Sequence, residues 1–457
     1  MGLFTTKGYD ADEFDEDGEN TALMTMNDTY INEDGETVPK QYREYTNEEL
    51  RAVARAMYQE HILNTSKNIH KDVQSRNVDK LVNVREGLLT SIQERLLSRP
   101  LSDGYCLTGE QIQTVLSLIT SIVWGYDVLD PLIQDDTVSD IKVYSADNIR
   151  VKRYGHRMDS GVHFESDADC ESFIRRILER NGINLGISNA NQTFTDSSQD
   201  KAILRISIVS ELLCDNKKPC MAIRKIPKHK QGLAALDKAG MFDHIRHKQK
   251  RVAELKQMSV GVENPALRDL IPKFIMSRGL LFTGKGASGK TTLMNALIDL
   301  IPKEDSVMIC QENSELFVDE KTHPDVLCTH VDINGGDSKV SYTLGDLTRM
   351  GLLIDLDRII VGEVKQADEA AGLSKASMTG HKCWTSVHGE NCDMAINKMA
   401  DYISQANRNY SFENCLSQIQ GFEYVIHLRN FQIDEVVHII GWDHETQTLQ
   451  TETVYKI

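Results

Sequence analysis

Residues 284–291 read Gly-Lys-Gly-Ala-Ser-Gly-Lys-Thr and satisfy the pattern G-x-x-x-x-G-K-[ST]. A short apolar run, residues 280–282, leads into this stretch, and apolar residues at helical spacing follow it over residues 293–301. A strand, a glycine-rich turn and a helix in this order bring backbone amides to a positive helix end, where they bind phosphate groups. The sequence therefore predicts a nucleotide site in an α/β fold.

Individual residues of this stretch have predictable roles. We expect the ammonium group of Lys290 to face the β and γ phosphates of a nucleotide, and the hydroxyl of Thr291 to ligate Mg²⁺. The other nucleotide-binding residues that we expect from the loop and the first helical turn are Gly284, Gly286, Ala287, Ser288, Gly289 and Thr292.

Two further apolar runs, residues 306–310 and 358–361, are followed by acidic residues. In open α/β sheets, ligands bind at the edge formed by the carboxyl ends of the strands. We therefore expect Glu363, after the second run, to hold Mg²⁺ through water. After the first run, Glu312 or Glu315 is expected to orient or deprotonate the attacking water.

A fourth apolar run, residues 383–387, is flanked by His381 and His388. We expect these histidines to sense the γ-phosphate or to report its loss to a neighbouring subunit, with His381 among the nucleotide-binding residues and His388 among the catalytic ones. Two alternatives stay open. The histidines are structural, or they form a metal site with Cys383 and Cys392, although the spacing is unlike that of a zinc finger.

Composition excludes several classes of protein. The 457 residues suffice for two or three domains, and 40% apolar with 26% charged residues exclude a wholly disordered chain. No apolar run approaches the roughly 20 residues that span a bilayer. The nine cysteines are scattered without a Cys-x-x-Cys pair, which favours a reducing compartment. A net charge of −17 argues against stable nucleic-acid binding.

The character of the sequence changes several times along the chain. Thr46-Asn47-Glu48-Glu49 is a capping box that begins a helical region, and strand patterns follow from residue 130 onward. We interpret the chain as an acidic disordered tail (1–45), a helical region (46–125), an α/β domain (126–228), a basic linker (229–265) and a nucleotide-binding domain (266–457). The tail is a solubilising segment or a docking arm for a basic partner. The linker is a solvated helix face or a contact to anionic lipid or nucleic acid.

Four motifs in this order resemble those of the type II/type IV secretion ATPase family. They are the phosphate-binding stretch, the acids within residues 311–315, the run 359–364 and the segment 379–388. In the family these elements are known as Walker A, Asp box, Walker B and His box. Two more stretches, within residues 131–143 and 222–226, resemble the branch that drives Flp/Tad-type pili. The resemblance covers roughly residues 126–457.

The resemblance implies a hexameric ring that hydrolyses ATP with Mg²⁺. Each subunit of such proteins has a PAS-like N-terminal domain and a RecA-like ATPase domain, with ATP bound between them. Basic residues of the first domain would close over the phosphates, and at the matching positions these are Arg205 and Arg224, with Lys225 as a further candidate. The implied partners are membrane-embedded platform proteins, and the implied location is the cytoplasm, peripheral to the inner face of the cell membrane.

The chain departs from the family pattern at the Asp box, which normally reads Glu-Asp where this chain has Gln311-Glu312. An amide cannot accept a proton as a carboxylate can. The role of general base would therefore pass to Glu312 or Glu315, or turnover would be slow. The sequence leaves three functions open: a motor for a pilus or a related secretion machine, the ATPase of a conjugative apparatus, and a nucleotide-gated assembly scaffold with little turnover.

Overall fold

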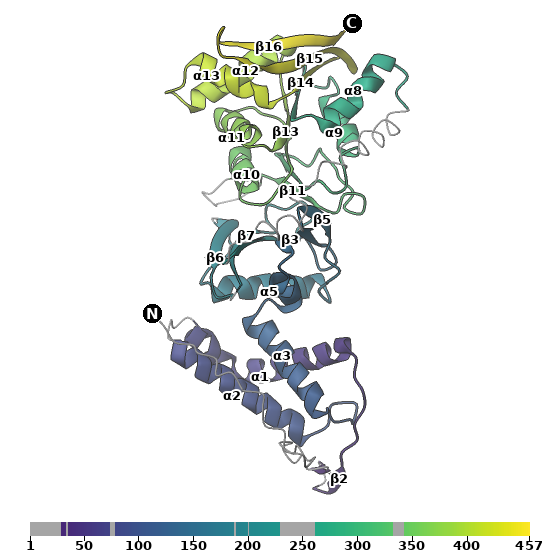
Figure 1. Cartoon of the computed structure of the whole chain (residues 1–457), viewed down its shortest axis with the longest axis vertical. Helices are drawn as coiled ribbons and strands as arrows, with labels where there is room; N and C mark the ends of the chain where they lie inside the picture. The colour runs from purple at the N-terminus through teal and green to yellow at the C-terminus, as the bar shows by residue number, and fades with distance from the viewer. Residues whose placement is uncertain are drawn as a thin grey trace, which may run out of the picture. The chain divides into compact units, whose positions relative to one another are not determined.

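The structure is a computed structural model of the chain (Figure 1) and describes residues 29–32, 35–73, 78–186, 189–199, 201–228, 261–331 and 342–457. It divides into two compact units, Met1–Asp127 and Val128–Ile457, which are described one at a time. The domain bounds expected from the sequence stay predictions. Most of the expected basic linker, 229–265, lies outside the described residues.

The first unit contains a short hairpin and three helices. Its elements are β1 (Thr29–Ile31), β2 (Thr37–Pro39), α1 (Asn47–Val73), α2 (Val78–Ser98) and α3 (Gly109–Trp124). The predicted capping box begins α1: the amide of Glu49 donates to Thr46 Oγ1 (3.2 Å), and the amide of Thr46 donates to Glu49 Oε2 (2.8 Å). Each helix contributes to one apolar core, with Leu50, Ile92 and Ile119 among its members.

Part of the segment expected as a disordered tail, residues 1–45, has defined structure. Strand β1 pairs antiparallel with β2, and Tyr42 forms an isolated bridge with Cys106. The guanidinium of Arg43 forms ion pairs with Glu49 and Asp103, each at 2.9 Å. The described segment from residue 35 to 45 is therefore ordered, contrary to that expectation. Residues 1–28 lie outside the described residues.

The second unit begins with a six-stranded antiparallel sheet. Its elements are η1 (Asp127–Leu129), α4 (Asp130–Gln134), β3 (Val138–Val143), β4 (Ile149–Arg153), β5 (His156–Asp159), α5 (Asp167–Arg180), β6 (Asn191–Asp196), β7 (Ala202–Val209) and β8 (Cys220–Pro227). The strand order is β5-β4-β3-β8-β7-β6. The strands predicted over 138–143, 149–151, 204–208 and 221–226 are all present, each within two residues of its expected bounds.

An eight-stranded sheet follows in the same unit. Its elements are α8 (Pro265–Met276), β9 (Gly279–Thr283), α9 (Lys290–Ile298), β10 (Val307–Gln311), β11 (Val326–His330), α10 (Leu344–Gly351), β12 (Arg358–Val361), α11 (Ala367–Met378), β13 (Lys382–Val387), α12 (Cys392–Ala406), α13 (Phe412–Gln418), η3 (Ile419–Gly421), β14 (Tyr424–Arg429), β15 (Gln432–Asp443) and β16 (Thr448–Lys456). The order is β11-β10-β12-β13-β9-β14-β15-β16. Strands β11 to β14 in that order run parallel, and β15 and β16 continue the sheet as antiparallel strands.

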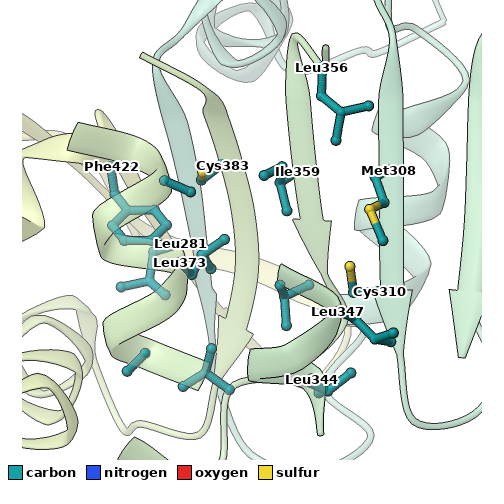
Figure 2. Packing of buried hydrophobic residues seen from close by; sticks show 14 of the residues in the cluster. Leu281, Met308, Cys310, Leu344, Leu347, Leu356, Ile359, Leu373, Cys383 and Phe422 are labelled. Carbon is teal, nitrogen blue, oxygen red and sulfur yellow. The ribbon is translucent and has the colours of Figure 1, made fainter. Parts of the chain in front are cut away.

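Helices cover both faces of this sheet, with α10 to α13 on one side and α8 and α9 on the other (Figure 1). Successive strand residues point to opposite faces. Leu281 of β9 therefore joins the core that includes Leu373 of α11 and Phe422 (Figure 2). Its neighbour Phe282 joins the core that includes Phe274 of α8. Burial on both faces explains why the parallel strands read as continuous apolar runs.

Buried charges join the two sheets of the second unit. Lys142 of β3 has a side chain that is 4% exposed and lies 3.6 Å from Asp325, which precedes β11. The hydroxyl of Tyr144 donates to the same carboxylate at 2.5 Å. Arg157 of β5 forms an ion pair with Asp355 at 2.5 Å. Burial by itself would raise the pKa of Asp325, but the positive charges of Lys142 and Arg157 outweigh it and lower the pKa.

Among the described residues, no single helix combines the length and the apolar composition needed to cross a bilayer. The consecutive pair α3 and Asp127–Gln134 meets these limits only when it is counted together across a bend.

Candidate phosphate-binding site

The site is built on the turn between β9 and α9, as the sequence predicts. Strand β9 is buried along its whole length and ends at Thr283. The turn that follows needs positive φ angles at Gly284 (144°), Ala287 (59°) and Gly289 (100°). These angles turn the backbone so that α9 begins at Lys290 with Gly289 as its N-cap. The amides of the first turn of a helix have no acceptor within the helix, so they are available to an anion.

The ammonium group of Lys290 lies inside this turn. It donates to the carbonyl oxygens of Gly284 and Lys285, each at 3.0 Å, and the residue is 8% exposed. Burial lowers the pKa of Lys290, and the carboxylate of Glu363 opposes this effect. The hydroxyl of Ser288 is buried in the same turn and has no hydrogen-bond partner. A bound phosphate group would place a negative charge beside the Lys290 ammonium and an acceptor oxygen beside the Ser288 hydroxyl.

A histidine ties the turn to the acid after β12. Nδ1 of His388 donates to the carbonyl oxygen of Gly284 (3.1 Å), and Nε2 faces Glu363 Oε1 (2.8 Å). His388 follows β13 and Glu363 follows β12, so both lie at the carboxyl edge of the sheet beside the phosphate turn. His388 therefore links the phosphate turn directly to this acid.

Lys365 holds two of the predicted catalytic acids together. Its ammonium group lies 2.5 Å from Glu312 Oε2 and 3.6 Å from Glu363 Oε2. The hydrogen bond to Glu312 is the main reason that the pKa of Lys365 is raised. No sequence motif indicates Lys365, although its place two residues after Glu363 puts it on the same sheet edge. In this conformation one ammonium group is therefore shared between the two carboxylates, with the shorter contact to Glu312.

Glu315 lies beside the first turn of α9. The hydroxyl of Thr291 donates to Glu315 Oε2 at 3.4 Å, and Asn295 donates to the carbonyl oxygen of Glu315 at 2.9 Å. A cleft of about 230 Å³ opens between these groups. It is lined by the phosphate turn and the acids, including Gly286, Ala287, Lys290, Thr291, Glu312, Glu315, Glu363 and His388.

The same residues fit a magnesium ion bound together with phosphate. Mg²⁺ in such sites takes most of its ligands from water and phosphate oxygens, and only one or two from the protein. The hydroxyl of Thr291 and the carboxylates of Glu315 and Glu363 are oxygen donors of the kind that this ion prefers. Thr292, the next residue on α9, is exposed on the same first turn.

The structure does not bring Arg205, Arg224 or His381 to this cleft. Arg224 binds Asp140 (2.9 Å) and Asp355 (3.0 Å), and Arg205 lies opposite it in the β7–β8 register. Asp355 precedes β12, so these arginines lie near the amino edge of the eight-stranded sheet, away from the phosphate turn. The roles predicted for Arg205 and Arg224 gain no support from this arrangement, and they stay predictions.

His381 precedes β13, whereas His388 follows it. Nδ1 of His381 lies 3.3 Å from the carbonyl oxygen of Ala376, at the end of α11. The whole length of β13, residues 382–387, therefore separates the two histidines. Because a regular strand rises about 3.3 Å per residue, His381 lies at the end of the strand far from the cleft and does not reach it in this conformation.

The metal-site alternative finds no support in the geometry. Cys383 and Cys392 are buried in an apolar core, and burial raises the pKa of both thiols (Figure 2 shows Cys383). Over the parts of the chain that the structure describes, no group of three or more His, Cys, Asp or Glu side chains is placed to hold a metal ion. The two histidines and the two cysteines are therefore not arranged as the ligands of one metal ion.

A phosphate-binding turn at the head of a helix, with carboxylates on the adjoining strand ends, defines a nucleotide-binding protein of the α/β class. The chain belongs to the type II/IV secretion system protein family, whose profile matches residues 125–421. This is a family of secretion ATPases.

The chain is similar to several known proteins. It is 24% identical over 275 residues to the type IV secretion system protein VirB11 of Brucella suis, which covers 58% of this chain and 73% of VirB11. It is 26% identical over 295 residues to the uncharacterized protein MJ0900 of Methanocaldococcus jannaschii, where the match covers 64% of this chain and 48%, about half, of that protein.

The fold is found in solved structures of other proteins. The crystal structure of the Brucella suis VirB11 ATPase in complex with sulphate superposes with a TM-score of 0.54 at 18% identity, covering 74% of this chain and 94% of that one. The mixed α/β fold expected from the sequence is therefore confirmed, and the division into a PAS-like and a RecA-like domain stays a prediction.

Proposed function

We propose that the chain is an ATP-hydrolysing motor that works as a ring of identical subunits, six by family resemblance. In this proposal the motor drives assembly of a type IV pilus of the Flp/Tad kind, or a related secretion machine, at the cytoplasmic face of the cell membrane. The observation that carries the proposal is the buried Lys290 ammonium at the start of α9, in a turn that also holds the partnerless Ser288 hydroxyl.

The residues of the cleft divide the work of phosphoryl transfer between them. Lys290 and the first-turn amides of α9 would bind the phosphates and place the γ-phosphate, and catalysis of this reaction is mostly positioning and electrostatics. Thr291 and one of the acids would hold Mg²⁺, which supplies charge neutralisation to the phosphate oxygens when bound. Glu312, Glu315 or Glu363 would orient the attacking water or take its proton.

Lys365 would control when an acid becomes available. In the described conformation its ammonium group binds Glu312 and lies near Glu363, so neither acid is free of a positive neighbour. A bound γ-phosphate offers Lys365 a competing anion. Transfer of Lys365 to the phosphate would release Glu312 as a base for water, which supports turnover even though Gln311 carries no charge.

The proposed partners are membrane-embedded platform proteins of the machine, and the proposed cofactors are ATP and Mg²⁺. Similarity to VirB11 favours one alternative in the same class, the ATPase of a conjugative or other type IV secretion apparatus. The uncharged Gln311 favours another, a nucleotide-gated assembly scaffold with little turnover.

Release of inorganic phosphate from MgATP by the purified chain tests the proposal. We expect steady hydrolysis by the wild type, loss of ATP binding or hydrolysis in Lys290→Ala, and MgATP binding with little hydrolysis in Glu363→Gln. Lys303→Ala, which changes an exposed lysine just beyond α9, is the matched control and should behave as the wild type. Wild-type hydrolysis in Lys290→Ala would refute the assignment of the site.

The same experiment separates the motor from the scaffold. A wild-type chain that binds ATP, assembles into a ring on a sizing column and releases no phosphate would support the scaffold and refute the motor.

A further inference from the structure

The side chain of Gln311, at the end of β10, uses all of its hydrogen-bonding capacity. Its Oε1 accepts from the amides of Glu315 and Leu316, each at 2.9 Å. Its Nε2 donates to Asp215 Oδ2 (3.1 Å) and to the carbonyl oxygen of Leu316 (3.3 Å). The residue is 2% exposed. Gln311 therefore fixes the loop that carries Glu312 and Glu315 along one side of the cleft.

Asp215 comes from the other sheet. It lies in the turn between β7 and β8, and this turn pairs with the edge strand β11 of the eight-stranded sheet. The amide of Asp215 donates to the carbonyl oxygen of Cys328 (2.9 Å), and Cys214 forms an antiparallel bridge with Thr329. The carboxylate of Asp215 lies 2.5 Å from His330 Nδ1 through one oxygen and accepts from Gln311 through the other.

We infer that Asp215 is a positioning residue for the catalytic loop, which it acts on through Gln311. The inference rests on the proposed ATPase function. Movement of the six-stranded sheet would carry Asp215 with it, pull on the Gln311 amide and shift the loop that holds Glu312 and Glu315. The chain of bonds Asp215–Gln311–Glu315 thus couples the placement of one sheet to the arrangement of the acids on the other.

The chemistry also explains why this chain has glutamine at position 311. A glutamate there could still accept from the amides of Glu315 and Leu316. Its second oxygen, however, would face the carboxylate of Asp215 and the carbonyl oxygen of Leu316, with no donor between them. Two carboxylates that face each other repel, and a buried acceptor without a donor is costly. Glutamine at 311 and aspartate at 215 are therefore a matched pair.

A double-mutant cycle tests the inference. Gln311→Glu adds a carboxylate at 311 but displaces the loop that holds Glu312 and Glu315, so it should lower kcat for ATP by about tenfold or more. KM should change little, because Lys290 and the phosphate turn are untouched, and a rise in kcat would overturn the inference. In Asp215→Asn with Gln311→Glu, the asparagine amide can donate to the new carboxylate. The double variant should therefore recover most of the lost kcat.

Glu211→Gln is the matched control, since Glu211 lies in the same turn but contacts Arg175 and Ser210. It should leave kcat unchanged. Additive losses in the double variant, with no recovery, would overturn the inference.

Hydrogen exchange at the amides of Glu315 and Leu316 gives a readout that does not need hydrolysis. Gln311→Glu and Asp215→Ala should both speed exchange at these two amides, and the double variant Asp215→Asn with Gln311→Glu should restore protection. Unchanged exchange in both single variants would overturn the inference. If the wild type binds ATP without hydrolysing it, the motor proposal fails, and the exchange data alone decide the role of Asp215.

Discussion

Alanine at Gly284 should disable the phosphate site. An ideal Cβ on Gly284 would lie 2.2 Å from the carbonyl oxygen of Leu428 and 2.6 Å from Ser288 Oγ, inside the 3.0 Å that real Cβ atoms keep. The hydroxyl can rotate away, but the carbonyl belongs to the backbone of β14. The turn must therefore shift by about 0.8 Å, the shortfall between 2.2 and 3.0 Å. The φ of 144° adds a cost of about 1–3 kcal/mol for a residue with a Cβ.

This shift reaches the chemistry because the carbonyl oxygen of Gly284 accepts from both Lys290 and His388. A misplacement of about 1 Å in a catalytic arrangement can cost roughly 100-fold in rate. We expect Gly284→Ala to lose about 100-fold in ATP turnover and to bind ATP much more weakly in a calorimetric titration.

Gly441→Ala is the control for this prediction. Gly441 lies on β15 of the same sheet, outside the residues that line the cleft, it has no positive φ, and a Cβ there would meet open space. Its ATP affinity and turnover should stay within about twofold of the wild type, since surface changes away from special features have small effects. Wild-type ATP affinity in Gly284→Ala, or equal losses in the two variants, would refute the steric argument.

Three further predictions follow from the charged residues. Arg224→Ala should retain ATP binding but lose turnover, by about 10³–10⁵ if it acts as a charge-stabilising arginine. Mixing it with Lys290→Ala subunits should restore activity if it acts across a subunit boundary, and unchanged turnover in Arg224→Ala would leave it as a surface residue. The pKa of Asp325 lies below its ordinary value of 3.8. The ionised Asp325 carboxylate therefore stabilises the folded state above that pH, and this stabilisation is lost as the pH falls through the lowered pKa. Asp325→Asn should flatten the acid side of the stability profile, and an identical profile would contradict this. Arg358 is fully buried and lies 2.8 Å from the buried Asp305. Arg358→Met should therefore lower the free energy of unfolding by about 3–5 kcal/mol. A loss of less than about 1 kcal/mol in a urea titration would contradict this prediction.

Local patterns in the sequence predict the site elements well. The apolar runs at 280–282, 306–310 and 358–361 correspond to β9, β10 and β12, and the capping box at Thr46 forms as expected. These features depend on neighbouring residues only: strand burial, glycine conformations and side chains that cap their own helix. For this reason the sequence alone indicates that Lys290, Thr291, Glu312, Glu363 and His388 gather at one edge of the sheet.

Contacts between distant segments could not be predicted in the same way. The partners of Arg224 lie at Asp140 and Asp355, and nothing near residue 224 in the sequence indicates that its guanidinium would bind them. Likewise, no local signal connects Asp215 with Gln311, which is 96 positions further along the chain. The placement of His381 needed the length and direction of β13, because only one end of a parallel strand reaches the cleft.

The position of β9 in the middle of its sheet affects how the protein must fold during synthesis. Leu280 pairs on one side with Trp384 and on the other with Tyr424, which is 144 positions later in the chain. At ribosomal speeds of about 5–20 residues per second, that delay is on the order of 10 s. During this time the strand that carries the phosphate turn has an unpaired edge, and such edges promote aggregation. A nascent chain stopped before β14 should therefore depend on chaperones to stay in solution, whereas release after β14 removes that exposed edge.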